Sequence, residues 1–167
     1  AMAGNSADVV GITDIDGTLS QSTGSIFTAN GTTDIDGTLS LNDGTFNANG
    51  NTEIDAVAGA LTITSGTYNA NVNLICNGSI SFSGVDLGTL NIKPVSPIIS
   101  TFNKGDNSIV RFIKTNGNQN IPDVNYDNLE IVGASIATKV PVAGLTVGGD
   151  LTITSSILRM TNGNIDL

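Results

Sequence analysis

A repeat of about twenty residues constrains the fold of this chain more than any other feature of its sequence. The octapeptide Thr-Asp-Ile-Asp-Gly-Thr-Leu-Ser occupies residues 13–20 and again residues 33–40, and a looser copy starts at Thr52. Each copy is followed by an aromatic residue with Asn three positions later, so that the repeats keep a period of 19 to 22 residues. A chain with such a period stacks one structural unit on the next, and the sequence therefore predicts a solenoid.

The alternation of residue types within a repeat identifies the stacked unit as a β-strand. Apolar residues alternate with Ser or Thr in 39–41, 61–64, 80–83 and 151–154, and a period of two is that of a strand with one buried face. The strands are short and are separated by turn dipeptides, namely Asp43-Gly44, Asn49-Gly50, Asn77-Gly78, Asn116-Gly117 and Asn162-Gly163.

Short strands with this period predict an all-β fold, a right-handed parallel β-helix (β-solenoid) with about 19–22 residues per coil. An antiparallel β-sandwich is the alternative, because it also places strands at intervals of about 8–12 residues. The register favours the solenoid, since equivalent residues recur once per coil, as stacking requires.

Three sets of equivalent residues are expected to stack along such a solenoid. Side-chain amides would form a hydrogen-bonded ladder at a corner, aromatic rings would stack beside it, and isoleucines would point into the core. The amides are Asn30, Asn49 and Asn71, the aromatic residues are Phe27, Phe46 and Tyr68, and the isoleucines are Ile15, Ile35 and Ile54. The single cysteine, Cys76, is expected to be a buried small hydrophobe.

Charge divides the chain into an acidic first part and a mixed second part. Residues 1–92 hold nine of the 15 acidic groups and neither Lys nor Arg, whereas all six basic residues come later. We expect regular acidic coils over 1–92, a loop or irregular insertion over 93–108 where two prolines interrupt the ladder, and continuing coils over 109–167. This would be one continuous domain and a fragment of a longer protein. The unpaired acidic half argues against nucleic acid and anionic membrane as partners.

Two columns of carboxylates are the candidate binding residues. If the isoleucines point inward, their neighbours point outward, with Asp14, Asp34 and Glu53 in one column and Asp16, Asp36 and Asp55 in the other. Hard oxygen ligands in this number suit Ca²⁺, and the sequence suggests no other cofactor. The alternative, which we prefer, is a set of Asx-type turns and solvated carboxylates without a cation.

The repeated octapeptide also resembles the nucleophile motif of the haloacid dehalogenase-like phosphohydrolases, in which the first Asp attacks phosphorus and the second handles the leaving-group proton. Two copies in tandem cannot both head an active site, because that site needs a single nucleophile assembled with distant partners. We therefore interpret the motif as architecture.

Composition makes other catalysis less favourable as well. The chain contains no His, the usual group for proton transfer near neutral pH. Carboxylates alone can run glycoside hydrolysis, so a polysaccharide-degrading β-helix enzyme is a minority interpretation. Such an enzyme needs one unique set of catalytic carboxylates, whereas here the same acidic residues recur in successive repeats. We expect the chain not to be an enzyme.

The second part of the chain carries a pattern of apolar and small residues over about residues 101–158. These are Val110, Phe112, Gly117, Gln119, Ile121, Tyr126, Asn128, Leu129, Ile131, Leu145, Val147, Gly149, Leu151, Ile153, Ser155 and Leu158. The pattern resembles the strand repeat of very large secreted surface proteins of the Bacteroidota. The resemblance implies β-solenoid stalks or adhesins exported across the outer membrane, and the acidic coils lie outside it.

We accordingly expect a non-catalytic structural or adhesive stalk segment of a secreted bacterial cell-surface protein, located outside the cell. The alternative is a carbohydrate-binding β-helix module, assisted by Ca²⁺, that would contact glycans through Tyr68, Tyr126 and the Asn ladder. The expected partners are extracellular glycans or other surface proteins, without nucleic acid and without insertion into a membrane. Exposed aromatic rings would favour the carbohydrate module, because sugars commonly bind on such rings.

Overall fold

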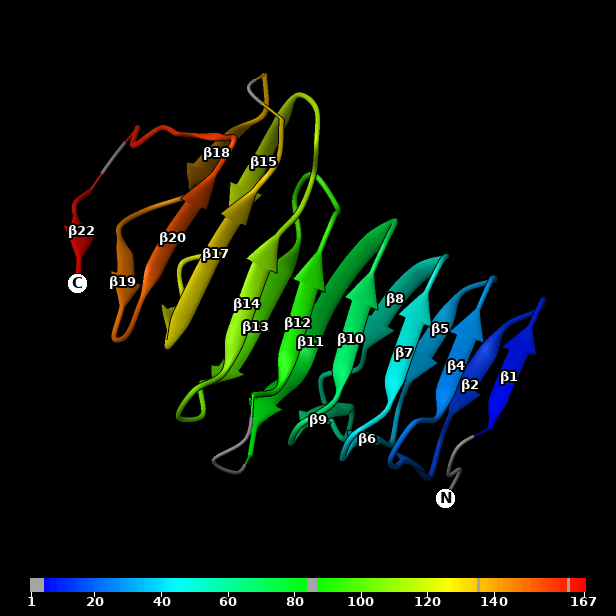
Figure 1. The fold of residues 1–167 in the computed structure, drawn as a ribbon. Helices are drawn as coiled ribbons and strands as arrows, with labels where there is room; N and C mark the ends of the chain where they lie inside the picture. The colour runs from blue at the N-terminus through cyan, green and yellow to red at the C-terminus, as the bar shows by residue number, and fades with distance from the viewer. Residues whose placement is uncertain (1–4, 84–86, 135, 162) are drawn as a thin grey trace.

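The computed structural model describes the chain except for residues 1–4, 84–86, 135 and 162. It shows a parallel β-solenoid of eight coils, seen from the side in Figure 1. Every strand pairing among the described residues is parallel, which confirms the predicted β-helix and excludes the antiparallel sandwich. These residues include no helix that could cross a membrane.

The coils differ in how many strands they contain. Coils 1 to 3 have three each: β1 (Ser6–Val9), β2 (Thr13–Ile15) and β3 (Thr18–Gln21), then β4 (Ile26–Ala29), β5 (Thr33–Ile35) and β6 (Thr38–Leu41), then β7 (Thr45–Ala48), β8 (Asn51–Ile54) and β9 (Ala60–Ile63). Coils 4 and 5 have two each: β10 (Thr67–Ala70) and β11 (Asn73–Phe82), then β12 (Thr89–Ile92) and β13 (Ile98–Asn103). Coils 6 to 8 return to three: β14 (Ile109–Phe112), β15 (Asn118–Ile121) and β16 (Asn125–Tyr126), then β17 (Asn128–Val132), β18 (Thr138–Pro141) and β19 (Leu145–Val147), then β20 (Leu151–Thr154), β21 (Ile157–Leu158) and β22 (Ile165–Asp166).

The strands that open the eight coils form one sheet along the whole molecule, in the order β1-β4-β7-β10-β12-β14-β17-β20. A second sheet contains the remaining strands of coils 1 to 5, where the long strand β11 joins the β2-β5-β8 ladder to the β3-β6-β9 ladder. In the last three coils these two ladders separate again into the small sheets β15-β18-β21 and β16-β19-β22.

Strand β11 departs from the sequence prediction, because Asn77-Gly78 lies inside it instead of forming a turn. The pairing with β13 shifts register between Cys76 and Ser79, so the dipeptide forms an irregularity in a continuous strand. A Cβ atom on Gly78 would lie 2.2 Å from the carbonyl oxygen of Gly59 in the coil below. The glycine is therefore needed for close stacking of backbones, which is a different use of glycine from a turn.

The predicted stacks are confirmed in the core. Ile15, Ile35 and Ile54 point inward and are at most 5% exposed, and Cys76 continues their column at 0%. The rings of Phe27 and Phe46 stack with centroids 5.0 Å apart, and those of Phe46 and Tyr68 with centroids 5.3 Å apart. Repetition in the sequence thus produces contacts between identical or similar side chains.

The region 93–108 is more regular than predicted. A loop does occur over 93–97, but strand β13 follows it and pairs with β11. The apolar residues Ile99 and Phe102 pack on the core and hold this strand in the stack. The solenoid therefore continues through the segment that was expected to interrupt it.

Candidate functional site

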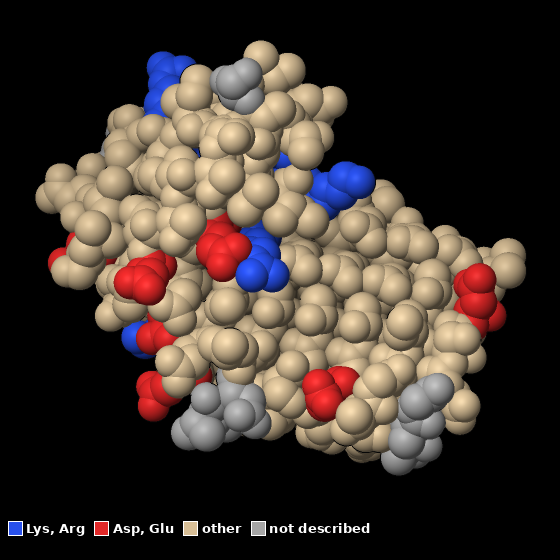
Figure 2. Space-filling model, viewed as in Figure 1, with Lys and Arg blue, Asp and Glu red and all other residues tan. Residues whose placement is uncertain are grey.

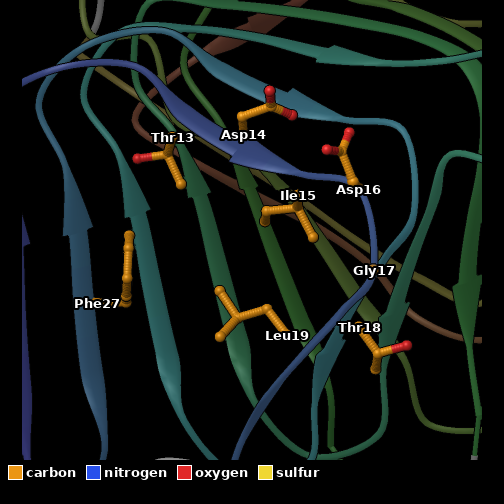
Figure 3. Close-up of a pocket in the computed structure, with 8 residues that line it drawn as sticks. All are labelled: Thr13, Asp14, Ile15, Asp16, Gly17, Thr18, Leu19 and Phe27. Atoms are coloured by element: carbon orange, nitrogen blue, oxygen red, sulfur yellow. The ribbon is translucent and has the colours of Figure 1, made fainter.

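The acidic columns occupy the outer side of β2, β5 and β8 and the corner that follows each strand. Asp14, Asp34 and Glu53 are register partners in successive coils. Figure 3 shows how this arises in coil 1, where Asp14 and Asp16 point away from the core and Ile15 between them points inward. The alternation of a β-strand therefore places two carboxylates per coil on one surface.

Carboxyl oxygens from five of the six predicted residues come together in two overlapping groups. One oxygen each of Asp14, Asp16 and Asp36 lie within 4.8 Å of one another, and the same holds for Asp34, Asp36 and Asp55. Asp36 belongs to both groups, whereas Glu53 stays in its column outside them. Carboxylate oxygens are ligands that a hard cation such as Ca²⁺ prefers, so the two groups are candidate ligand sets for this ion.

Mutual repulsion helps to raise the pKa of two of these carboxylates, Asp14 and Asp36. The negative charge of Asp16 is the main reason that the pKa of Asp14 is raised, with smaller contributions from partial desolvation and from Asp34. Partial desolvation leads for Asp36, whose pKa is raised further by the charges of Asp55 and Asp34. One carboxyl oxygen of Asp34 is buried and has no hydrogen-bond partner. The cluster thus disfavours its own charge, and occupation by Ca²⁺ stays a prediction.

A hollow of about 340 Å³ lies beside the first carboxylates. Ile15, Leu19 and Phe27 form its apolar side, and Asp14 and Asp16 stand at its polar edge (Figure 3). The lining residues come from coils 1 and 2 and do not converge on a single reactive group.

The octapeptide shared by 13–20 and 33–40 is an architectural corner. Both copies adopt the same strand, corner, strand conformation and stack in register, with Leu19 opposite Leu39. The Gly37 N–H donates to the carbonyl oxygen of Ile15, at 2.6 Å. Gly37 thus allows the backbones of coils 1 and 2 to approach, because a Cβ atom there would lie 2.1 Å from the Gly17 carbonyl oxygen, and this gives the repeated motif a structural role.

The aromatic residues are placed unfavourably for sugar binding. Tyr68 and Tyr126, which we expected to contact glycans in a carbohydrate module, are both fully buried. The Tyr68 hydroxyl lies 2.8 Å from the Thr52 hydroxyl, and the Tyr126 hydroxyl donates to the Pro122 carbonyl oxygen at 2.9 Å. Burial raises the pKa of both phenols. The two tyrosines are core residues and offer no platform to a ligand.

The predicted amide ladder forms, and a second one lies beside it. Asn49 donates to Asn30 and Asn71 donates to Asn49, each at 2.9 Å. The second ladder runs over β7, β10 and β12 through Asn47, Asn69 and Asn91, with N···O distances of 2.8 and 2.7 Å. Its signal in the sequence is a constant spacing of 22 residues, whereas the members of the first ladder are 19 and then 22 residues apart.

The visible surface reflects the division of charge found in the sequence. Figure 2 shows basic side chains over the left and centre of the view and only acidic ones at the right, over the first strands. Between them, the face over β4, β7, β10 and β12 is almost free of charge and carries the second amide ladder. The regular half therefore presents neutral hydrogen-bonding groups on one face and carboxylates on another.

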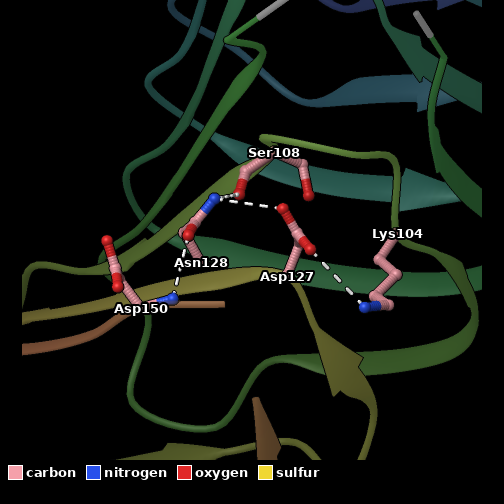
Figure 4. Close-up of polar contacts among 5 residues, drawn as sticks. All are labelled: Lys104, Ser108, Asp127, Asn128 and Asp150. Atoms are coloured by element: carbon pink, nitrogen blue, oxygen red, sulfur yellow. Dashed lines mark hydrogen bonds and ion pairs between the residues drawn. The ribbon is translucent and has the colours of Figure 1, made fainter. Parts of the chain in front are cut away.

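A polar cluster in the second half links three coils through Asn128 (Figure 4). Its amide nitrogen donates to the Ser108 carbonyl oxygen at 3.2 Å and to Asp127 at 3.1 Å, and its amide oxygen accepts the Asp150 N–H at 3.0 Å. Lys104 lies 3.5 Å from the Asp127 carboxylate. The cluster joins adjacent coils where their backbones turn, and its groups bond to one another.

No family of known proteins, no curated protein and no solved structure matches this chain. The fold and the side-chain geometry are therefore the basis for any statement about what the chain does.

Proposed function

We propose that the chain is a non-catalytic stalk segment of a secreted bacterial cell-surface protein, with a structural or adhesive role outside the cell. The observation that carries this proposal is the continuous stacking of eight coils, reinforced outside the core by two amide ladders. A solenoid buries a core by adding coils along one axis, so that its length grows with the number of repeats. Such a rod suits spacing and display.

The proposed mechanism is cohesion between coils. Each coil bonds to the next through backbone ladders over the long sheet and through side chains such as Asn49, which both donates and accepts an amide hydrogen bond. Amides can repeat in this way without limit, because each carries a donor and an acceptor. A force along the axis must then break many parallel bonds for each coil released.

Force spectroscopy tests this mechanism. The chain, held between two handles at its termini, should unravel in steps that correspond to groups of coils, at a force well above that for stretching an unfolded chain. Asn49→Ala removes two ladder bonds and should lower the first unfolding force. The matched control is Asn125→Ala, an exposed asparagine in β16 whose side chain forms no hydrogen bond with another described residue. Extension without any force peak would contradict the stalk proposal.

Adhesion is tested separately by a binding screen. The purified chain would be applied to arrays of glycans and of bacterial surface proteins in millimolar Ca²⁺, and every hit repeated in EDTA. A purely structural segment should show no saturable binding. Saturable binding to a few related glycans would instead identify a carbohydrate module, and its loss in EDTA would indicate a cation at the acidic columns.

A further inference from the structure

Lys139 is the most unusual residue in the interior of the solenoid. It lies in β18 with its side chain in the core, fully buried. Its register partners in the neighbouring coils are Gln119 in β15 and Leu158 in β21. Lysine is almost never fully buried unless a carboxylate pairs with it. Most fully buried residues of the solenoid are apolar, so a buried lysine needs a physical explanation.

The amine of Lys139 is held by neutral oxygen atoms. Its Nζ atom donates to the Lys114 carbonyl oxygen at 2.8 Å and to the Gln119 side-chain oxygen at 2.5 Å. Gln119 is also fully buried, and its oxygen accepts the Lys114 N–H at 3.2 Å. Its amide nitrogen donates to the carbonyl oxygens of Ile92 at 2.8 Å and Pro94 at 2.9 Å. Two side chains thereby connect coils 5, 6 and 7.

The charges around this amine do not compensate it. The ion pairs of the described residues are Lys104–Asp127 and Arg111–Glu130, so no carboxylate pairs with Lys139. The charged group that acts on it is Lys114, of the same sign, whose own Nζ atom lies 3.3 Å from the Asn116 side-chain oxygen.

The strands packed against β18 add no opposite charge. On β15 the partner is the neutral Gln119, and on β21 it is the apolar Leu158. Arg159, which follows Leu158, is exposed and contacts Lys139 through its backbone N–H. Burial is the main reason that the pKa of Lys139 is lowered to about 8, and Lys114 contributes to the same shift.

We propose that Lys139 makes the cohesion of coils 5 to 7 responsive to pH. The protonated amine places an unpaired charge inside the solenoid and weakens the connection, and the neutral amine keeps hydrogen bonds there without that cost. The connection between coils 5 to 7 is thus weaker in neutral and acidic solution and stronger in mildly alkaline solution. The acidic coils 1 to 4 contain no such group.

The direction follows from proton linkage. The folded-state pKa lies below that of an unfolded lysine, so the unfolded chain binds more protons between about pH 8 and about pH 10.4. Stability contributed by Lys139 therefore rises with pH through this window. Cys76 acts oppositely at higher pH, because burial raises its pKa to about 11 and its thiol ionises more readily in the unfolded chain.

The test compares the whole chain with its Lys139→Met variant, and uses Lys93→Met at an exposed position as the control. Urea unfolding of the unsubstituted chain should show an unfolding equilibrium constant that falls about tenfold from about pH 7 to about pH 9, relative to Lys139→Met. Lys93→Met should keep that tenfold dependence. Contributions of Cys76 and the tyrosines are common to all three proteins and cancel in the comparison. Equal pH dependence in all three would overturn the proposal.

A direct titration keeps the proposal testable if Lys139→Met fails to fold. NMR of the unsubstituted chain labelled with ¹³C-lysine should show one lysine signal that titrates near pH 8. Amide hydrogen exchange, corrected for its intrinsic pH dependence, should slow in coils 5 to 7 above that midpoint and stay unchanged in coils 1 to 4. A common midpoint for all lysines would refute a buried, pH-responsive amine.

Discussion

Coils 1 to 4 and coils 5 to 8 solve the same stacking problem with different chemistry. In the first half the columns repeat identical or similar residues, as in the amide ladder Asn47-Asn69, which continues to Asn91 in coil 5. In the second half the same outward column continues with Arg111 and Glu130, whose side chains form a two-point ion pair at 2.5 and 3.2 Å. Amides can stack on identical copies because they donate and accept, whereas charged groups must alternate in sign.

The acidic columns stack charges of the same sign instead of alternating them. Asp14 and Asp36 lie beside like charges, and the pKa of each is raised, mainly by the charge of Asp16 for Asp14 and by partial desolvation followed by the charges of Asp55 and Asp34 for Asp36. The first half therefore places its repeated carboxylates on the outer surface, while the second half has two surface ion pairs among its described residues and leaves one amine, Lys139, without a carboxylate partner in the interior. The following predictions separate these two ways of stacking, from the largest effect to the smallest.

Gly37→Ala should give the largest loss of stability. A Cβ atom at this corner would lie 2.1 Å from the carbonyl oxygen of Gly17 and 2.5 Å from that of Asp16, so the backbones of coils 1 and 2 would have to move apart. Overpacking in a rigid core costs about 1–3 kcal/mol, and a clash with backbone should reach at least about 3 kcal/mol. Chemical denaturation of the variant and the parent chain measures the difference.

Gly17→Ala is the matched control for this prediction. It introduces the same atom at the same corner of coil 1, where nothing lies within 4 Å. Its cost should stay within about 0.5 kcal/mol, as for a surface substitution. Similar losses in both variants would show that glycine is needed for its own backbone conformation and that close approach of the coils is unimportant.

Exchange of phenylalanine and tyrosine in the aromatic stack should give intermediate effects of opposite sign. Tyr68→Phe leaves the buried Thr52 hydroxyl without its partner and should cost about 1–2 kcal/mol. Phe46→Tyr should instead gain about 0.5–1 kcal/mol, because the Thr33 hydroxyl one coil earlier is buried and unpartnered. Thermal unfolding of both variants measures the pair, and a loss in Phe46→Tyr would mean that the core has no room for the added oxygen.

Much of the first half could be predicted from the sequence, because its information is local and repeated. The period of 19 to 22 residues assigned the register, and the register correctly placed the Asn30 ladder, the Phe27 stack and the inward Ile15 column. One correct alignment of the repeats was enough to position every equivalent residue. The acidic columns followed from the same alternation of inward and outward side chains.

The parts that escaped prediction depend on contacts between unlike residues far apart in the chain. Nothing local indicates that Lys139 would share a buried network with Gln119 and the carbonyl of Pro94, because the three come from different coils. Asn77-Gly78 looked like a turn, since a dipeptide alone does not reveal that a long strand passes through the corner. Tyr126 was placed on a surface only in the carbohydrate alternative, and its strand β16 has just two residues, too few for an alternation that would indicate its burial.

Glu130→Gln should show a smaller effect that depends on salt. The Arg111–Glu130 pair is about one-third exposed, at 35% and 28%, so its loss should cost about 0.5 kcal/mol at low ionic strength and less at high ionic strength. Asn69→Ala, in the same column of the first half, should have a cost that salt does not change, because its amide bonds are neutral. Urea unfolding in dilute and in molar NaCl separates the two responses, and salt-independent loss for Glu130→Gln would mean that packing of the side chains is what matters.

Asp36→Asn should have the smallest effect on stability and the opposite sign. The folded-state pKa values of Asp14 and Asp36 are raised above the value in an unfolded chain, so ionisation opposes folding. Stability in the first half should therefore increase as pH falls from neutral toward about 4 and decrease as pH rises through the raised pKa values, the reverse of the dependence expected from Lys139. Added NaCl should stabilise the parent chain by screening, and Asp36→Asn should reduce both responses.

Calcium sharpens this last comparison, because Asp36 contributes to both groups of three carboxylates. If repulsion is relieved only by screening, CaCl₂ and NaCl at equal ionic strength should raise the unfolding temperature by similar amounts. A specific cation would stabilise the folded chain further by mass action, with a saturating dependence on its concentration, and Asp36→Asn would remove that excess. Asp43→Asn, at an exposed turn outside both groups, changes net charge by the same amount and should leave the excess intact. Equal loss in the two variants would attribute the effect to net charge, and the repeated carboxylates would then be a solubilising surface whose only requirement is exposure to solvent.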